Sequence, residues 1–202
     1  AREIADLIRT NADKSEKCVL GLATGSSPIK LYEELVRMHR EEGLSFKNVV
    51  SFNLDEYLPM PKESEQSYHY FMHHHLFDHI DIDPKNIHIP DGTLKAEEIE
   101  NFCKEYERQI EAAGGIDIQV LGIGRTGHIG FNEPGSPLTS KTRMVYLDDL
   151  TIKDAAGDFG GMENVPSRAI TMGVGTIMKA RKVILLAWGE KKASIIKATV
   201  EG

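Results

Sequence analysis

The sequence predicts an α/β protein with a mostly parallel sheet and helices on both of its faces. Short, almost continuously apolar runs recur along the chain, which is the pattern of parallel strands covered on both sides. Segments with helical periodicity lie between these runs, so strands and helices alternate as in βαβ units. The 202 residues suffice for one domain of ordinary size.

The individual elements follow from these patterns. The stronger strand candidates are residues 18–23, 49–54, 118–122 and 183–188, and the weaker ones are residues 143–147 and 168–172. After Pro28, Leu31, Leu35 and Met38 recur at i, i+4 and i+7, which predicts an amphipathic helix. Further amphipathic helices are expected over residues 67–77, 96–113 and 191–200.

Charge and composition limit the function classes. Lys and Arg total 24 against 31 Asp and Glu, and this net charge of -7 without a basic stripe argues against a nucleic-acid partner. No apolar run approaches the roughly 20 residues of a membrane helix, and no signal peptide opens the chain. Cys18 and Cys103 are far apart, which favours a reducing cytosol over disulfides or structural zinc. We expect a cytoplasmic enzyme or binding domain without a membrane partner.

Ligands of parallel sheets bind beyond the carboxyl ends of the strands, so the loops that follow strands are informative. The first reads TGSSP, in which Pro28 suits the first helical position and Ser26 or Ser27 the N-cap. Backbone N–H groups and hydroxyls at a helix N-terminus form an anion site. The expected phosphate ligands are Thr24, Gly25, Ser26 and Ser27. The alternative is a capped turn without a ligand.

Two further loops carry charged residues. Asp55 and Glu56 follow an apolar strand, where a shielded carboxylate has a raised pKa and can act as a general base. The alternative is a solvated loop acid. Lys191 and Lys192 follow the last strand and can supply a positive charge to a phosphate, unless they only begin an exposed helix.

The glycine-rich loop at residues 122–137 is the richest in chemistry. It contains a formal G-x-G-x-x-G, but Gly130 and Pro134 prevent the helix that dinucleotide binding requires. The loop instead holds His128 near Glu133. A carboxylate fixes the tautomer of an imidazole and raises its basicity, so this pair suits proton transfer. The alternative is a structural histidine.

Two groups of residues are set aside. The consecutive His73, His74 and His75 point about 100° apart on a predicted helix, so they cannot face one metal ion. The acidic stretch around Glu97 is interpreted as a solvated helix face.

Taken in order, TGSSP, FNLDEY, GHIGFNEP, TMGVGT and the final Gly-x-x-Lys turn resemble the glucosamine-6-phosphate deaminases, also called isomerases, over nearly the whole chain. The resemblance implies a Rossmann-like three-layer α/β/α sandwich, shared with ribose-5-phosphate isomerase and 6-phosphogluconolactonase. It also implies conversion of glucosamine 6-phosphate and water into fructose 6-phosphate and ammonia, without a metal or organic cofactor.

The same resemblance assigns roles to residues. Asp55 matches the base that moves a proton between carbon 2 and carbon 1, and His128 matches the residue that assists ring opening, supported by Glu133. The TGSSP loop and Lys192 match the phosphate cradle. With a net charge of -7, the phosphate must be held by such local groups and not by a global positive field.

Three departures from the family are visible. Members of the family have an aspartate at the position of Thr126, where it forms an Asp-His-Glu relay. A hydroxyl can orient an imidazole but cannot stabilise its charged form as a carboxylate does. Residues 155–159 lack the arginine of a mobile lid, and their glycine suggests a flexible segment. Arg143 and Ser136 match an allosteric site, but Val145 replaces its lysine, so activation by N-acetylglucosamine 6-phosphate is not expected.

Two other functions stay open. One is a sugar-phosphate-binding or regulatory module of low activity, which Thr126 favours. The other is 6-phosphogluconolactonase-type hydrolysis. Asp55 disfavours it slightly, because lactone hydrolysis does not need a base that removes a proton from carbon. Gluco- or galacto-configured substrate and a homo-oligomeric state are also left open. Members continue beyond the end of this chain, so we expect one domain over residues 1–202, truncated at its C-terminus and part of a longer protein.

Overall fold

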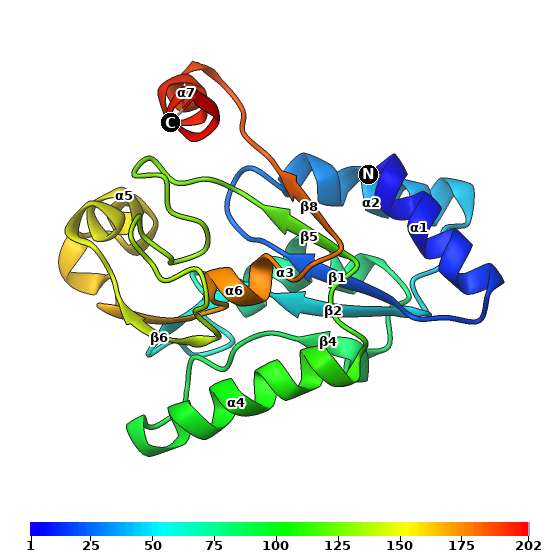
Figure 1. The fold of residues 1–202 in the computed structure, drawn as a ribbon, viewed down its shortest axis with the longest axis horizontal. Helices are drawn as coiled ribbons and strands as arrows, with labels where there is room; N and C mark the ends of the chain where they lie inside the picture. The colour runs from blue at the N-terminus through cyan, green and yellow to red at the C-terminus, as the bar shows by residue number, and fades with distance from the viewer. Residues whose placement is uncertain (202) are drawn as a thin grey trace.

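The computed structural model describes residues 1–201. Its centre is a five-stranded sheet in the order β4-β2-β1-β5-β8, in which every neighbouring pair is parallel. These strands are β1 (Cys18–Leu22), β2 (Val49–Asn53), β4 (Ile87–His88), β5 (Ile118–Leu121) and β8 (Lys182–Leu185). Helices lie on both sides of this sheet (Figure 1), which confirms the predicted three-layer α/β/α class.

The two faces of the sheet carry separate hydrophobic cores, because successive strand residues point to opposite sides. The helices α1 (Arg2–Asp13), α2 (Ile29–Glu42) and α3 (Tyr68–His75) pack on one face, where Leu20 is fully buried. The helix α4 (Ala96–Ala112) covers the other face, where Phe52 packs against its side chains. Burying each large apolar side chain of this kind contributes about 1.5–3 kcal/mol.

A second, antiparallel sheet was not expected from the sequence. It has the order β3-β7-β6, formed by β3 (Asp55–Leu58), β7 (Arg168–Thr171) and β6 (Arg143–Tyr146). The interpretation of Asp55 and Glu56 as loop residues was therefore wrong. Both lie in a strand, where Asp55 pairs with Thr171. Acidic residues have low strand propensity, and this strand forms through a pairing more than 100 residues away, which a local pattern does not reveal.

Residues 155–159, for which the sequence suggested a flexible segment, are helical. These residues form the last turns of α5 (Asp149–Phe159). The carboxylate of Asp148 accepts the N–H of Leu150 at the start of this helix, and Gly160 ends it with a φ of 70°, in the left-handed region. The two caps define a short helix despite Gly157 in its interior.

The remaining elements complete the chain. They are the short helix α6 (Val174–Ile177), the 3-10 turns Phe77–His79, Pro84–Asn86, Met162–Asn164 and Glu190–Lys192, and α7 (Ala193–Glu201). The last predicted helix thus begins as a 3-10 turn, and α7 stands away from the central sheet in Figure 1. None of the helices within residues 1–201 has the length and hydropathy that crossing a bilayer requires.

All six predicted strands are present, and the main difference is that β8 ends at Leu185, three residues early. Helix α1 was not predicted, because charged residues occur throughout the segment, although Ile4 and Ile8 recur at a helical spacing and are buried. The predicted serine cap of α2 is also wrong, because Pro28 occupies the N-cap and no side chain caps the helix. The three consecutive histidines lie on α3, as expected.

Candidate active site

A cavity of about 230 Å³ lies where the carboxyl ends of β1 and β5 meet the start of β3. It brings together residues from five separate segments, as expected for the carboxyl edge of a parallel sheet. Of the predicted site residues it is lined by Thr24, Gly25, Ser26, Ser27, Asp55, His128 and Lys192. Glu133 and Thr126 do not line the cavity, but both contact Nδ1 of His128.

One end of the cavity is suited to an anion. Gly25 has a φ of 85°, which lets the chain turn from β1 toward the N-terminus of α2. Within residues 1–201 the hydroxyls of Thr24, Ser26 and Ser27 make no hydrogen bond, so all three can receive a ligand. Lys192 is held beside them by donating a 2.7 Å hydrogen bond to the carbonyl of Ile123. Hydroxyls, a helix N-terminus and an ammonium group together can hold a phosphate.

Asp55 provides a carboxyl group inside this cavity. Its side chain is 6% exposed, and burial, aided by the neighbouring charge of Glu56, raises its pKa to about 8. Gly130, with a φ of 57°, lets the glycine-rich loop approach closely, since a Cβ there would lie 3.2 Å from Oδ2 of Asp55. A group with a pKa near neutrality can take up and release a proton, which suits a general base.

Glu56 has a different position from Asp55, because neighbours on a strand point to opposite sides. Its carboxylate accepts the backbone N–H groups of Tyr57, Tyr68 and His69, and so fastens β3 to the start of α3. Burial outweighs these hydrogen bonds and raises the pKa of Glu56 to about 7. Glu56 does not line the cavity, and its hydrogen bonds give it a structural role beside the cavity.

The glycine-rich loop brings Thr126, His128 and Glu133 together, as the sequence suggested. The hydroxyl of Thr126 donates to Oε2 of Glu133 at 2.7 Å, so its oxygen is left to accept the N–H of His128 Nδ1 at 2.9 Å. Nδ1 also lies 3.2 Å from Oε1 of Glu133. These partners place the ring proton on Nδ1 and leave Nε2 as the free base. Gly124 makes room for the ring, because a Cβ there would lie 2.1 Å from Nε2.

The net effect on the imidazole differs from the expectation. Burial lowers the pKa of His128 more than the charge of Glu133 raises it, and Lys192 lowers it further. Glu133 thus raises the basicity of the ring as predicted, but burial has the larger effect and the net pKa is lowered. The lowered pKa favours the neutral ring, whose Nε2 can accept a proton.

Thr151 and Tyr68 belong to the site but were not predicted from the sequence. The hydroxyl of Thr151, on α5, donates to Oε1 of Glu133 at 2.9 Å. Tyr68, the first residue of α3, lines the cavity, and its ring stacks on that of Phe131 with 6.1 Å between centroids. Neither belongs to a local motif, and both reach the site only through tertiary packing.

Ser136 and Arg143, which the resemblance matched to one allosteric site, line different cavities. Ser136 lines a small cavity beside α6, whereas Arg143 lines a groove between α4 and β6 and donates to Oδ1 of Asn132. Within residues 1–201, no three His, Cys, Asp or Glu side chains are grouped so as to hold a metal ion.

The parallel sheet and the polar cavity at its carboxyl edge define a class of protein, a Rossmann-like α/β enzyme with acid–base groups in a largely buried site. Comparison with known proteins identifies the family. The family described as glucosamine-6-phosphate isomerases/6-phosphogluconolactonase matches residues 1–202, and the chain belongs to it.

Several relatives are similar over the whole chain. The glucosamine-6-phosphate deaminase of Thermoanaerobacter sp. (strain X514) is 48% identical over 202 residues, which are 100% of this chain and 79% of the relative. That of Shewanella woodyi is 54% identical over 198 residues, 98% of this chain and 74% of the relative. A putative glucosamine-6-phosphate deaminase-like protein of Bacteroides thetaiotaomicron is 52% identical over all 202 residues, which make up only 30% of its length.

Solved structures agree on the fold. A monomeric glucosamine-6-phosphate deaminase superposes with a TM-score of 0.93 at 41% identity, covering 100% of this chain and 81% of that one. The 6-phosphogluconolactonase of Thermotoga maritima has a TM-score of 0.72 at 23% identity, covering 99% of this chain and 85% of its own, and shares the fold.

Proposed function

We propose that this chain catalyses the conversion of glucosamine 6-phosphate and water into fructose 6-phosphate and ammonia. The observation that carries the proposal is the buried carboxyl of Asp55, which shares one cavity of about 230 Å³ with the TGSSP loop, Lys192 and His128. The relatives named as glucosamine-6-phosphate deaminases, at 48% and 54% identity, support the same substrate.

The first step is opening of the sugar ring. The phosphate binds to the hydroxyls of residues 24–27 and to Lys192, which places the sugar in the cavity. Nε2 of His128 accepts the proton of the carbon 1 hydroxyl and returns it to the ring oxygen, and the bond between carbon 1 and the ring oxygen breaks. Thr126 and Glu133 hold the imidazole in the tautomer that this transfer needs.

The second step is a proton shift along the open chain. The carboxylate of Asp55 removes the proton of carbon 2 and delivers it to carbon 1. A proton of the substrate ammonium passes to the carbonyl oxygen of carbon 1, which leaves a hydroxyl at carbon 1 and a protonated imine at carbon 2. Water adds to the imine carbon, and ammonia departs as the ketone forms. A pKa of about 8 leaves the carboxyl of Asp55 mostly protonated at neutral pH, and the substrate ammonium beside it lowers this pKa and so favours the carboxylate that acts as the base.

Ammonia release from glucosamine 6-phosphate by the purified chain tests the proposal. Asp55→Asn is the matched inactive variant, because it keeps the shape and removes the base. We expect turnover by the wild type and a loss of about 10²–10⁴-fold in the variant, the usual contribution of a general base. No turnover by the wild type would contradict the proposal.

Two parallel assays separate the other functions. Hydrolysis of 6-phosphogluconolactone that survives Asp55→Asn would indicate a lactonase. Tight calorimetric binding of glucosamine 6-phosphate without ammonia release would indicate a binding module. Galactosamine 6-phosphate in the same assay decides the configuration of the substrate.

A further inference from the structure

Thr126, His128 and Glu133 form a hydrogen-bonded relay. We infer that Thr151 is a positioning residue of this relay: its hydroxyl holds Glu133, which in turn fixes the imidazole of His128. This inference rests on the proposed function for its kinetic consequence. The residue lies in α5, outside every motif of the sequence, and its hydroxyl donates to Oε1 of Glu133 at 2.9 Å.

The carboxylate of Glu133 is held at both ends. Thr126 donates to Oε2 at 2.7 Å and Thr151 to Oε1 at 2.9 Å. Oε1 is also the oxygen that lies 3.2 Å from Nδ1 of His128, a longer contact than either hydroxyl makes. Without the hydroxyl of Thr151, only this long contact would hold Oε1, and the carboxylate could rotate away from the imidazole.

The position of Thr151 in its helix supports a specific role for the hydroxyl. Thr151 is 7% exposed, whereas its neighbour Leu150 is 46% exposed. Threonine hydroxyls within helices often bond to a carbonyl of the preceding turn. The hydroxyl of Thr151 instead reaches a different segment of the chain, and a buried hydroxyl requires such a partner.

Helix α5 also bounds a second cavity of about 260 Å³ that His128 and Lys192 share with the first. Asp154 of α5 lines this second cavity and forms an ion pair with Arg125 at 2.7 Å. The hydrogen bond of Thr151 thus joins the wall of one cavity to the relay of the other.

The charged groups around His128 come from several elements. They are Glu133 and Arg125 of its own loop, Asp154 and Asp158 of α5, Lys192 after β8, and Asp55 of β3. Among these, Glu133 is the group that raises the pKa of the imidazole most, against the lowering by burial. A loss of its orientation therefore lowers the pKa of His128.

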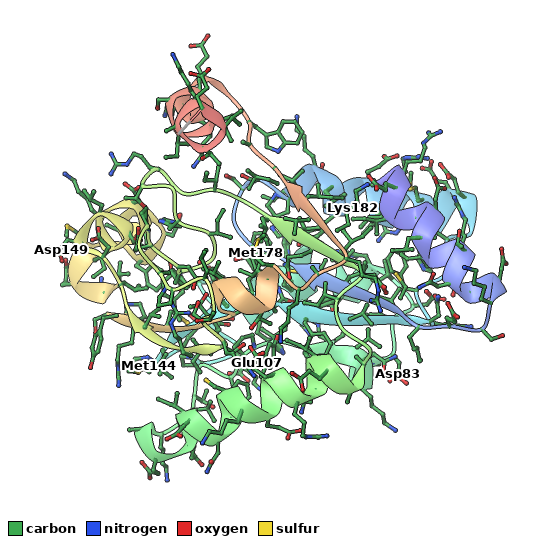
Figure 2. All side chains as sticks on the ribbon, in the orientation of Figure 1. Asp83, Glu107, Met144, Asp149, Met178 and Lys182 are labelled. Carbon is green, nitrogen blue, oxygen red and sulfur yellow. The ribbon has the colours of Figure 1, made fainter. Side chains whose placement is uncertain are left out.

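Thr151→Val tests the inference, because valine keeps the shape and removes the hydroxyl, and Thr151→Ser keeps the hydroxyl. The matched control is Thr176→Val, which removes another buried hydroxyl that donates to a glutamate, Oε1 of Glu107, at 2.6 Å. Figure 2 labels Glu107 on α4, away from α5, which carries the labelled Asp149. This control separates loss of a buried hydrogen bond from loss of the relay.

The readouts are steady-state ammonia release and an NMR titration of the His128 ring. For Thr151→Val we expect kcat to fall about tenfold or more with KM within about twofold, and the pKa of His128 to fall by about 0.5. Thr151→Ser should restore both, and Thr176→Val should change neither.

Three results would overturn the inference: an unchanged or raised pKa of His128 in Thr151→Val, equal losses in the serine variant, or equal losses in Thr176→Val. The titration needs no turnover. If the wild type is inactive, the proposed function fails while the titration still decides the role of Thr151.

Discussion

The hydroxyl of Thr126 donates a 2.7 Å hydrogen bond to Oε2 of Glu133. A carboxylate at position 126, where the resembled family has an aspartate, would face Glu133 across a similar distance. Two carboxylates so close repel each other, and one of them gains a raised pKa. The hydroxyl avoids this repulsion and still accepts the N–H of His128 at 2.9 Å. Thr126 therefore preserves the orientation of the imidazole while Glu133 remains the one carboxylate next to Nδ1.

Replacing Thr126 by valine tests this arrangement. Valine can neither donate to Glu133 nor accept from His128, so the ring loses its fixed tautomer and one carboxylate oxygen loses its donor. We expect kcat to fall about 10–100-fold, which is less than the roughly 10²–10⁴-fold that a positioned acid–base group contributes, because the imidazole itself is retained. Steady-state ammonia release measures this effect. Thr126→Ser retains the hydroxyl and should stay within a few-fold of the wild type; an equal loss in both variants would show that the methyl group matters instead.

Much of the central sheet was predictable, because its strands are short apolar runs whose pattern is local. The second sheet was not, since β3 begins with Asp55 and Glu56 and depends on pairing with β7 more than 100 residues away. The grouping of the TGSSP loop with Asp55 and His128 followed from the rule that parallel strands place their carboxyl ends at one edge. Thr151 could not be found in this way, because its hydrogen bond depends on how α5 packs.

Gly124→Ala should displace the imidazole of His128, to which we assign the ring-opening step. A Cβ at position 124 would lie 2.1 Å from Nε2 of His128, far inside van der Waals contact, so the ring must move. We expect kcat to fall about 10²-fold, as a displacement near 1 Å can produce. The measurement is ammonia release with circular dichroism to show that the fold persists. Gly135→Ala is the control for loop substitution, because no atom lies within 4 Å of its Cβ position, although its φ of 92° adds some strain. Full activity of Gly124→Ala would show that the ring position is not required.

Lys192→Ala should weaken substrate binding more than catalysis. Its ammonium group lies in the cavity with the TGSSP loop, on the side that we assign to the phosphate. We expect KM to rise about tenfold or more with a small change in kcat, because the lost interaction is present in both ground and transition states. The neighbouring Lys191 does not line the cavity, so Lys191→Ala is a matched control and should retain the wild-type KM. A similar rise of KM in both variants would indicate a general charge effect.

Asp55→Asn should make the protein more stable at alkaline pH while removing its activity. The pKa of Asp55 in the folded chain, about 8, lies above the ordinary value of 3.8, so the folded chain binds this proton more tightly than the unfolded chain. Its contribution to the free energy of unfolding is therefore complete at low pH and is lost as the pH rises through about 8. Asparagine cannot ionise, so the variant avoids this loss. Between about pH 4 and about pH 8.5, the difference in free energy of unfolding should shift by about 2 kcal/mol or more in favour of the variant.

Urea unfolding at the two pH values measures this difference. Asp81→Asn provides a control of opposite sign: although burial acts to raise its pKa, the N–H of Phe46 and the hydroxyl of Ser45 hold the pKa of Asp81 below its ordinary value. The carboxylate of Asp81 therefore stabilises the folded chain above that ordinary pKa, and its loss should cost stability near neutral pH. If Asp55→Asn instead follows the wild type at both pH values, Asp55 is ionised in the folded chain, and the raised pKa that suits it to act as a base near neutrality is absent.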